Sequence, residues 1–475
     1  MTRSSSTAAQ DELTAALEVL RAELNVPADF PADVLREAER VAGETTVEPG
    51  DLLADLRDIE FVTIDPAGST DLDQAVHLQR SGDGAILHYA IADVPAYVEP
   101  GGAVDHEARE RGQTLYAPDG RVPLHPTILS EDAASLLAEQ DRRAFVWRFV
   151  LDAKANPTEV TLTRAVIRSR AQWSYVDAQA AIEAGTAPET LMAMPWFGAE
   201  RAAREIERGG ASLNLPEVRI ERDGDTYRLE IDEGVPLEDW NAHVSLLTGM
   251  AAARIMLDGG IGILRTMPPA SPEDVAAFRA QTVALGMPWP DDVPYGAYLQ
   301  SLDRGPVARA VKEHAAGLFR GAGYTTFDGD IPEVSEQAAI AAPYAHTTAP
   351  LRRLVDRWSL VVCDALANGR EVPTWARESL PTIPDLMERS NQRVRQVEAG
   401  ALDRIEAAVL HGREGDEFDA VVLRERGDGV RVALLDPPVE ATLERATALP
   451  GTEVRVRLRR TSIADGVVEF EQVRG

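Results

Sequence analysis

The pattern of apolar and polar positions predicts a helical start to the chain. Residues 11–24 repeat apolar side chains at helical spacing, and residues 27–43 hold a second helical pattern that ends at Gly43. Residues 1–10 are small and polar, and we expect them to be disordered. The two helices are too short to bury a large core of their own.

Strands and helices alternate through the middle of the chain. The run "IEFVTI" predicts a strand that ends at Asp65, and "LDQAVHLQR" and "AILHYAIADV" flank "SGDG", which indicates a hairpin. Residues 271–286 predict a helix with Ser271 as its N-cap, and residues 351–369 and 384–410 predict two more.

After about His411 the pattern changes to short alternating runs such as "DEFDAVVLRER" and "EVRVRLRR". Such runs favour a small five-stranded barrel of the OB type. We therefore expect an α+β protein in three parts: a short helical region at 1–50, a domain with a mixed sheet and helices at 51–410, and the barrel at 411–475.

Composition narrows the class of protein. The apolar fraction of 44% is ordinary for a globular chain, and no apolar stretch reaches the length of a membrane helix. The N-terminus lacks the apolar segment of a secretory signal, so we expect a cytoplasmic location without membrane contact. Cys363 is the single cysteine, which excludes an intrachain disulfide and a cysteine-zinc site.

The charge balance points in two directions. The formal net charge of −30 would repel a nucleic acid. Of the 48 basic residues, however, only Lys154 and Lys312 are lysine, which leaves 46 arginines. A codon bias explains this, but arginine also suits bidentate contacts to phosphate, so a basic groove inside an acidic shell stays open.

Three aspartates gather in "TIDPAGSTDLDQA", residues 63–75. Asp71 and Asp73 leave the same face of an extended chain, and a turn after Asp65 brings its carboxylate close to both. Carboxylates are the ligands that magnesium prefers, and such ions can promote phosphodiester hydrolysis. A solvated loop held by local turn hydrogen bonds is the alternative.

Three long motifs resemble one family. "FVTIDPAGSTDLDQA", "YAIADVPAYVEPGGAVDHEARERGQTLYAPDGRVPLHPTILS" and "PYAHTTAPLRRLVDRW" strongly resemble, in order and spacing, the catalytic domain of the ribonuclease II / RNase R family. The resemblance runs from about residue 55 to residue 410, and the barrel stands where the family has its OB-type RNA-binding domain. The family's two N-terminal cold-shock domains are not found in the sequence.

The resemblance implies an RNB-type 3′→5′ exoribonuclease that hydrolyses single-stranded RNA to nucleoside 5′-monophosphates with Mg2+, or with Mn2+. Asp65, Asp71 and Asp73 match three of the family's four catalytic acids and would bind the metal. The fourth position holds Gln74, an uncharged candidate ligand. Arg352, in "PLRRL", matches the arginine expected to stabilise charge on the scissile phosphate.

RNA contacts are implied at several further positions. Aromatic side chains stack on bases in such channels, and two tyrosines match RNA-contacting residues of the family. A glutamate matches one near the terminal-nucleotide pocket. A histidine lies in "YAHTTAP", and a second arginine follows Arg352 in "PLRRL". The candidate RNA-binding residues are Tyr116, Tyr175, Arg353, His346 and Glu398.

Two rival readings stay open. Gln74 motivates an RNB-fold protein that binds RNA but is catalytically weak or inactive. A metal-dependent phosphatase for small molecules would leave the barrel without a use. No ATP-binding motif of the Walker type occurs, and we expect a monomer. The role of residues 1–50 is open between a winged-helix-like module, a docking surface for a protein partner and a plug over the RNA channel.

Overall fold

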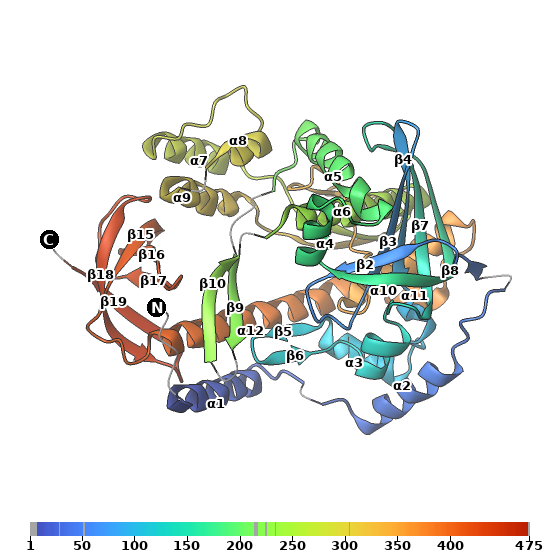
Figure 1. Ribbon diagram of the computed structural model, residues 1–475, viewed down its shortest axis with the longest axis horizontal. Coiled ribbons are helices and arrows are strands. Elements are labelled where there is room, and N and C mark those ends of the chain that lie inside the picture. Colours follow the sequence, from blue (N-terminus) through green and yellow to red (C-terminus); the bar gives the residue numbers. More distant parts are fainter. Residues whose placement is uncertain are drawn as a thin grey trace.

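The computed structural model describes residues 7–473 except 28, 51–52, 213–216, 224–225, 233 and 304. Its centre is a six-stranded mixed sheet in the order β1-β8-β2-β3-β4-β7, in which β7 also pairs with β8, so that the sheet curls back on itself (Figure 1). The strands are β1 (Ala54–Asp55), β2 (Phe61–Asp65), β3 (Gln74–Ser81), β4 (Gly84–Ala92), β7 (Asp141–Leu151) and β8 (Pro157–Ser174).

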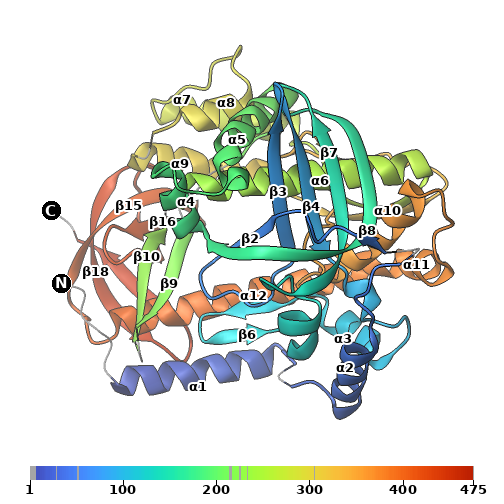
Figure 2. The same ribbon diagram turned by 45° about the vertical axis from the view of Figure 1, so that its right-hand side comes forward.

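Helices surround this sheet. The long helix α12 passes beneath it and reaches the C-terminal strands, and α1 lies alongside α12 in both ribbon views (Figures 1 and 2). The helices are α1 (Thr7–Glu23), α2 (Ala32–Glu44), α3 (Ala103–Arg111), α4 (Tyr175–Glu183), α5 (Glu189–Arg208), α6 (Pro236–Gly259), α7 (Pro272–Ala284), α8 (Tyr295–Ser301), α9 (Pro306–Ala315), α10 (Leu354–Ala367), α11 (Thr374–Ser379) and α12 (Ile383–Leu410).

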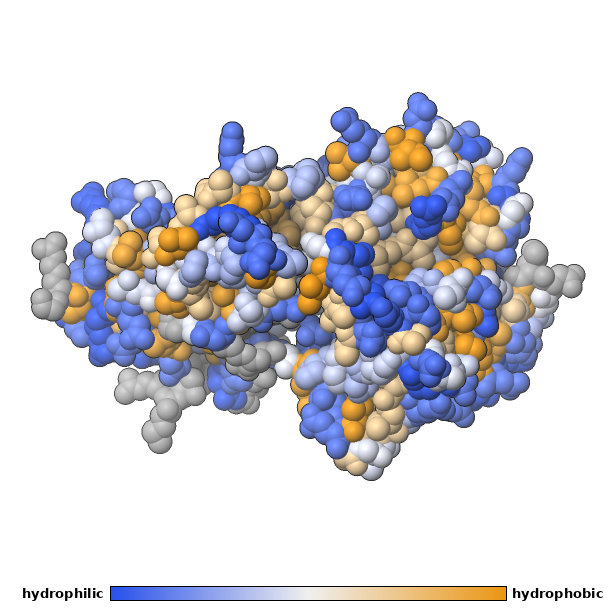
Figure 3. All heavy atoms as spheres, turned by 90° about the horizontal axis from the view of Figure 1, so that it is seen from above, coloured by the Kyte–Doolittle hydropathy of each residue, from blue (hydrophilic) through white to orange (hydrophobic). Residues whose placement is uncertain are grey.

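Short paired strands complete the central part. Each forms a two-stranded antiparallel ribbon. These ribbons are β5 (Leu115–Ala117) with β6 (Gly120–Val122), β9 (Glu217–Asp223) with β10 (Thr226–Asp232), β11 (Ile261–Thr266) with β12 (Gly323–Asp328), and β13 (Glu336–Gln337) with β14 (Ala342–Pro343). Seen from above, the surface is mostly hydrophilic with smaller apolar patches, and it is hollowed between the half with α7–α9 and the half with α5 (Figure 3).

The predicted C-terminal barrel is confirmed as a five-stranded antiparallel sheet in the order β17-β16-β15-β18-β19. Its edge strands β17 and β19 approach each other, so the sheet is nearly closed. The strands are β15 (Glu417–Arg426), β16 (Gly429–Leu434), β17 (Glu440–Leu443), β18 (Glu453–Ser462) and β19 (Val467–Gln472). The predicted α+β class is likewise confirmed.

Other local predictions are also confirmed. The strand β2 ends at Asp65, and β3 and β4 form the predicted hairpin. The Ser271 hydroxyl accepts the backbone N–H of Asp274 at 3.1 Å, as an N-cap should. Sequence periodicity therefore placed these elements to within a few residues.

The start of α1 corrects the expectation of disorder over residues 1–10. Thr7–Gln10 are helical, while residues 1–6 lie outside the described residues. The physical reason is tertiary: Ala9 and Leu13 are 2% and 1% exposed, in one apolar cluster with Ile405 of α12 and Val456 of β18. Burial against distant segments stabilises a helix end that local sequence would leave frayed.

The second helix is also part of a shared core. Val34, Ala38 and Val41 of α2 are buried in a cluster with Phe61 of β2 and Leu72. Both N-terminal helices thus pack on elements from the rest of the chain. Among the described residues, no helix is long and apolar enough to cross a bilayer.

Candidate active site

The loop between β2 and β3 brings the three aspartates together. It turns sharply after Asp65, where the Ser69 hydroxyl donates to the Pro66 carbonyl at 2.8 Å and Gly68 adopts a φ of +83°. A left-handed φ favours glycine because it has no Cβ to clash. The turn returns the chain antiparallel to β2, so Asp71 and Asp73 come back beside the strand end that carries Asp65.

Asp73 is the most deeply buried of the three, with 3% of its surface exposed. Its Oδ1 accepts the backbone N–H of Leu351 at 2.7 Å, and its Oδ2 lies 3.6 Å from Nε of Arg352. Burial raises the pKa of Asp73 to about 8, although the nearby Arg352 charge opposes the shift. Burial therefore disfavours the ionised form of this carboxyl, and a bound cation would favour it.

Asp65 has a buried carboxylate oxygen that no protein group in the described part of the chain satisfies. Its Oδ2 is buried and has no hydrogen-bond partner in the described structure. Burial raises the pKa of Asp65 to about 6, with Arg352 acting against the shift and Asp71 adding to it. A buried carboxylate oxygen without a partner is costly, so the site is incomplete as protein alone.

Asp71 has partners. The Tyr116 hydroxyl donates to its Oδ2 at 3.0 Å, and Nη1 of Arg121 donates to its Oδ1 at 2.5 Å. Arg121 also pairs with Glu131 at 2.8 Å and donates to the Thr70 hydroxyl at 2.6 Å. Arg121 and Glu131 are site residues that the sequence reasoning missed, although the turn "APDG" just before Arg121 indicated the hairpin that presents it.

The segment 344–353 forms the opposite wall. The Gln74 side chain donates through Nε2 to the carbonyl of Thr348 at 2.6 Å. Asp356 accepts the backbone N–H of Ala349 at 2.7 Å and two donors of Arg353 at 2.9 and 2.8 Å. Arg353 therefore braces the start of α10, while Arg352, with 47% of its side chain exposed, faces Asp73.

The donor set fits a hard divalent cation at Asp65 and Asp73. Carboxylate oxygens suit magnesium, and the unpartnered Oδ2 of Asp65 is the kind of group that an ion would satisfy. The described residues contain no ready group of three or more His, Cys, Asp or Glu placed to hold a metal. If Asp71 joined such a site, the ion would share its carboxylate with Arg121 and Tyr116.

The other predicted residues differ in how close they lie to the acids. The Tyr175 hydroxyl accepts from Asn241 at 3.1 Å, and its pKa is raised, mainly by burial, with a contribution from the Asp65 charge. Tyr116 leaves 44% of its surface exposed beside Asp71. Both tyrosines thus border the acidic site.

His346 and Glu398 are placed differently. His346 shares a hydrogen bond of 2.7 Å between its Nδ1 and the Tyr324 hydroxyl, and burial together with the Arg353 charge holds its pKa well below the ordinary value. Glu398 is exposed on α12, and no contact in the described structure links it to the acids. Their roles in RNA binding stay predictions, as does that of Arg353.

Comparison with known proteins defines the family to which this chain belongs. The RNB domain model matches residues 53–362, and the model of the RNase II-type exonuclease C-terminal S1 domain matches residues 416–473. The first match covers most of the chain and includes the aspartate loop and the arginine motif. The chain belongs to the RNB family of exoribonucleases.

Individual relatives agree with this class. The chain is 25% identical to Ribonuclease R of Aquifex aeolicus over 90% of its own length and 63% of that protein. Its fold is similar to that of Mycoplasma genitalium RNase R in complex with ribose-methylated single-stranded RNA, with a TM-score of 0.88 at 18% identity over 98% of this chain and 78% of that one.

A second structural neighbour is not an active nuclease. Yeast Ssd1, described as a pseudonuclease, has a TM-score of 0.69 at 17% identity over 83% of this chain and 50% of its own. The chain spans between 22% and 63% of the length of the first curated relatives that it matches. The comparisons therefore define the fold and the family, and the geometry of the site bears on the activity.

Proposed function

We propose that this protein is a 3′→5′ exoribonuclease that hydrolyses single-stranded RNA to nucleoside 5′-monophosphates and requires Mg2+, for which Mn2+ can substitute. The observation that carries the proposal is the placement of Arg352 at 3.6 Å from the buried Asp73, next to the unpartnered Oδ2 of Asp65. Two buried carboxyls and one exposed arginine form the arrangement needed to hold a cation and a phosphodiester together.

Magnesium, when bound, would neutralise the carboxylates and polarise the scissile phosphate. Asp65 and Asp73 would hold it, with Asp71 as a third ligand whose charge is shared with Arg121. Leu351 fixes the Asp73 carboxyl through its backbone N–H, so the orientation of this ligand is set before any ion arrives. The half-exposed Arg352 guanidinium is free on its outer side to balance charge on a phosphate.

Two tyrosines would position the RNA strand. The exposed ring of Tyr116 offers a face on which a base can stack, while its hydroxyl is held by Asp71. Tyr175, held by Asn241, would border the same strand from the start of α4. We also propose that the protein acts in the cytoplasm as a monomer, without ATP.

A time course on 5′-labelled single-stranded RNA tests the proposal. Wild-type protein with Mg2+ is expected to shorten the RNA stepwise from its 3′ end and to release nucleoside 5′-monophosphates. Protein with EDTA, and the Asp73→Asn variant with Mg2+, are expected to leave the RNA intact. Shortening in the EDTA lane would contradict the metal requirement, and internal cleavage would contradict the exonuclease mode.

A second candidate is an RNA-binding protein that has lost catalysis. Gln74 favours it, because its amide nitrogen donates to the Thr348 carbonyl and its side chain adds no charge to the site. Intact RNA in every lane, together with a retained shift of the RNA in a native gel, would establish this reading.

A further inference from the structure

The ribbon β5–β6 connects Asp71 to the N-terminal helix. Its residues Tyr116 and Arg121 both bond Asp71, and its turn residue Asp119 pairs with Arg21 of α1 at 2.7 Å. Arg21 and Asp119 are 98 residues apart in sequence, and both side chains are mostly buried, at 27% and 15% exposed. A partly buried pair of this kind holds its geometry better than an exposed one.

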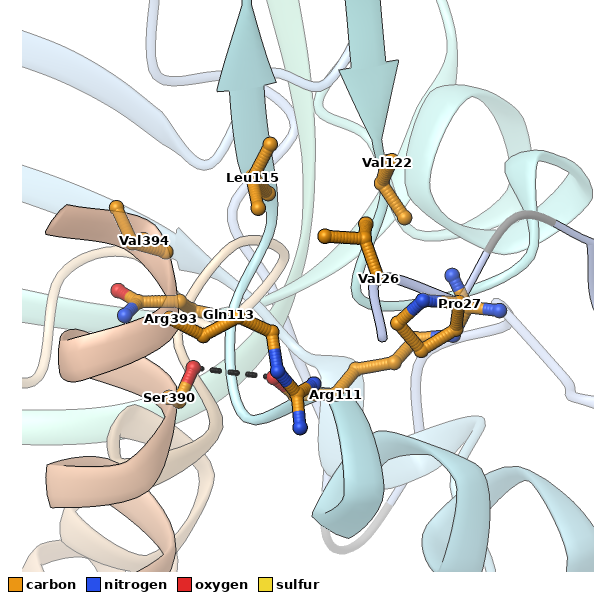
Figure 4. A pocket seen from close by; sticks show the side chains of 9 residues that line it. All are labelled: Val26, Pro27, Arg111, Gln113, Leu115, Val122, Ser390, Arg393 and Val394. Atoms are coloured by element: carbon orange, nitrogen blue, oxygen red, sulfur yellow. Dashed lines mark hydrogen bonds between the residues drawn. The ribbon is translucent and has the colours of Figure 1, made fainter. Parts of the chain in front are cut away.

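Both ends of this connection are fixed to the body of the protein. The apolar face of α1, with Leu13, Leu17 and Leu20, is buried on α12 and the C-terminal strands. At the base of the ribbon, Leu115 and Val122 line a small pocket with Val26 and Pro27 from the segment after α1 and Ser390 from α12 (Figure 4). The Ser390 hydroxyl donates to the Arg111 carbonyl at 3.0 Å beside it. The ribbon is thus held at its base and at its turn.

Arg121 occupies the position of a cation. It bonds Asp71 and Glu131 together, and the Asp71 side chain is only 12% exposed. A divalent ion that uses Asp71 as a ligand would bind a carboxylate whose Oδ1 already accepts from Arg121 and whose Oδ2 accepts from Tyr116. The guanidinium and the ion would therefore compete for the negative charge of one carboxylate.

We propose that Arg121 is a positioning residue that competes with the divalent ion for Asp71, and that the Arg21–Asp119 pair strengthens this competition by anchoring the ribbon to α1. The proposal rests on the proposed function, because it assumes that an ion binds at the aspartates. It assigns to helix α1, through Arg21, a role as an anchor for the ribbon that holds Asp71.

Direct binding of Mn2+ to the full chain tests this without an activity measurement. The electron paramagnetic resonance signal of free Mn2+ gives the Kd for each variant. Arg121→Gln removes the competitor, and Arg21→Gln removes the anchor at a distance from the acids. Arg148→Gln is the matched control, since it breaks a surface pair with Glu159 at 2.9 Å and changes net charge equally.

We expect Arg121→Gln to lower the Kd for Mn2+ by roughly three- to tenfold, the scale of one partly buried ion pair. Arg21→Gln is expected to lower it by about two- to threefold, with Arg148→Gln unchanged. Asp119→Asn should match Arg21→Gln, and the double variant should add nothing further, because both remove one pair. Thermal unfolding checks that each variant is folded.

Any other result would contradict a specific part of the proposal. A higher Kd in Arg121→Gln would show that Arg121 supports the site, and an unchanged Kd would show that it does not compete with the ion. An effect in Arg121→Gln with none in Arg21→Gln and Asp119→Asn would remove the anchor and leave a local charge effect. Absence of Mn2+ binding to every variant would overturn both this proposal and the metal requirement, whereas degradation of RNA with unchanged Kd values would overturn this proposal alone.

Discussion

The backbone N–H of Leu351 donates to Oδ1 of Asp73 at 2.7 Å, although 278 residues separate them in sequence. This bond joins the aspartate loop to the segment that carries Arg352. A backbone donor has little freedom to move, so the fold fixes the Asp73 carboxyl next to the backbone that carries Arg352.

The pH dependence of stability should change in Asp73→Asn. The folded-state pKa of Asp73 is about 8, against an ordinary 3.8, so between these values the folded protein binds more protons than the unfolded chain. Stability contributed by this group therefore falls as pH rises through that window. Asparagine keeps the acceptor for Leu351 and does not titrate, so we expect the variant to gain stability relative to wild type between pH 5 and pH 8.

Thermal unfolding in EDTA at several pH values measures this difference. Added Mg2+ should stabilise the wild type most at the high-pH end, where Asp73 is ionised, and should stabilise Asp73→Asn less. A stability difference between the two proteins that does not vary with pH would contradict the assignment.

Replacement of Arg352 should separate binding from catalysis. We expect Arg352→Ala to slow RNA hydrolysis by roughly 100- to 1000-fold, because it removes a charged donor aimed at the phosphate. Arg352→Lys should recover only part of the rate, since lysine lacks the planar fork. Single-turnover rates and RNA affinities are the measurements, with Arg148→Ala as the control, and an Arg352→Ala rate within about threefold of wild type would exclude a role in the transition state.

Tyr116 has two separable parts. Its ring is exposed while its hydroxyl is bonded to Asp71. Tyr116→Ala should weaken single-stranded RNA binding by about 1–3 kcal/mol through loss of stacking. Tyr116→Phe should preserve RNA affinity, so equal losses in the two variants, measured by fluorescence anisotropy, would argue against stacking.

Gln74→Asp tests the uncharged fourth position. An aspartate cannot donate to the Thr348 carbonyl, and it adds a negative charge beside Asp73. We expect the variant without metal to lose about 1–3 kcal/mol of stability. With Mg2+ it should reach half-maximal activity at a lower ion concentration, because an added carboxylate ligand raises affinity. An unchanged requirement for Mg2+ would mean that position 74 does not face the ion.

The sequence by itself determined the local elements and indicated the candidate site residues. Alternation of apolar and polar residues placed β2, the β3–β4 hairpin and the C-terminal strands, because periods of two and 3.6 residues are local properties of the backbone. The motif around Asp65, Asp71 and Asp73 marked the acidic loop, and "PLRRL" marked Arg352. Only the resemblance of these motifs to one family, and not their spacing, predicted that the residues share a function.

Only the tertiary structure decided how they meet. The contacts Leu351–Asp73, Gln74–Thr348 and Arg21–Asp119 join segments that are 98 to 278 residues apart, and no periodic pattern encodes them. The same holds for the first turn of α1, which is helical because its apolar face is buried on α12. Arg353 pairs locally with Asp356, whereas Arg352 lies beside Asp73, which is distant in sequence. Only the fold decides which of the two adjacent arginines reaches the acidic loop.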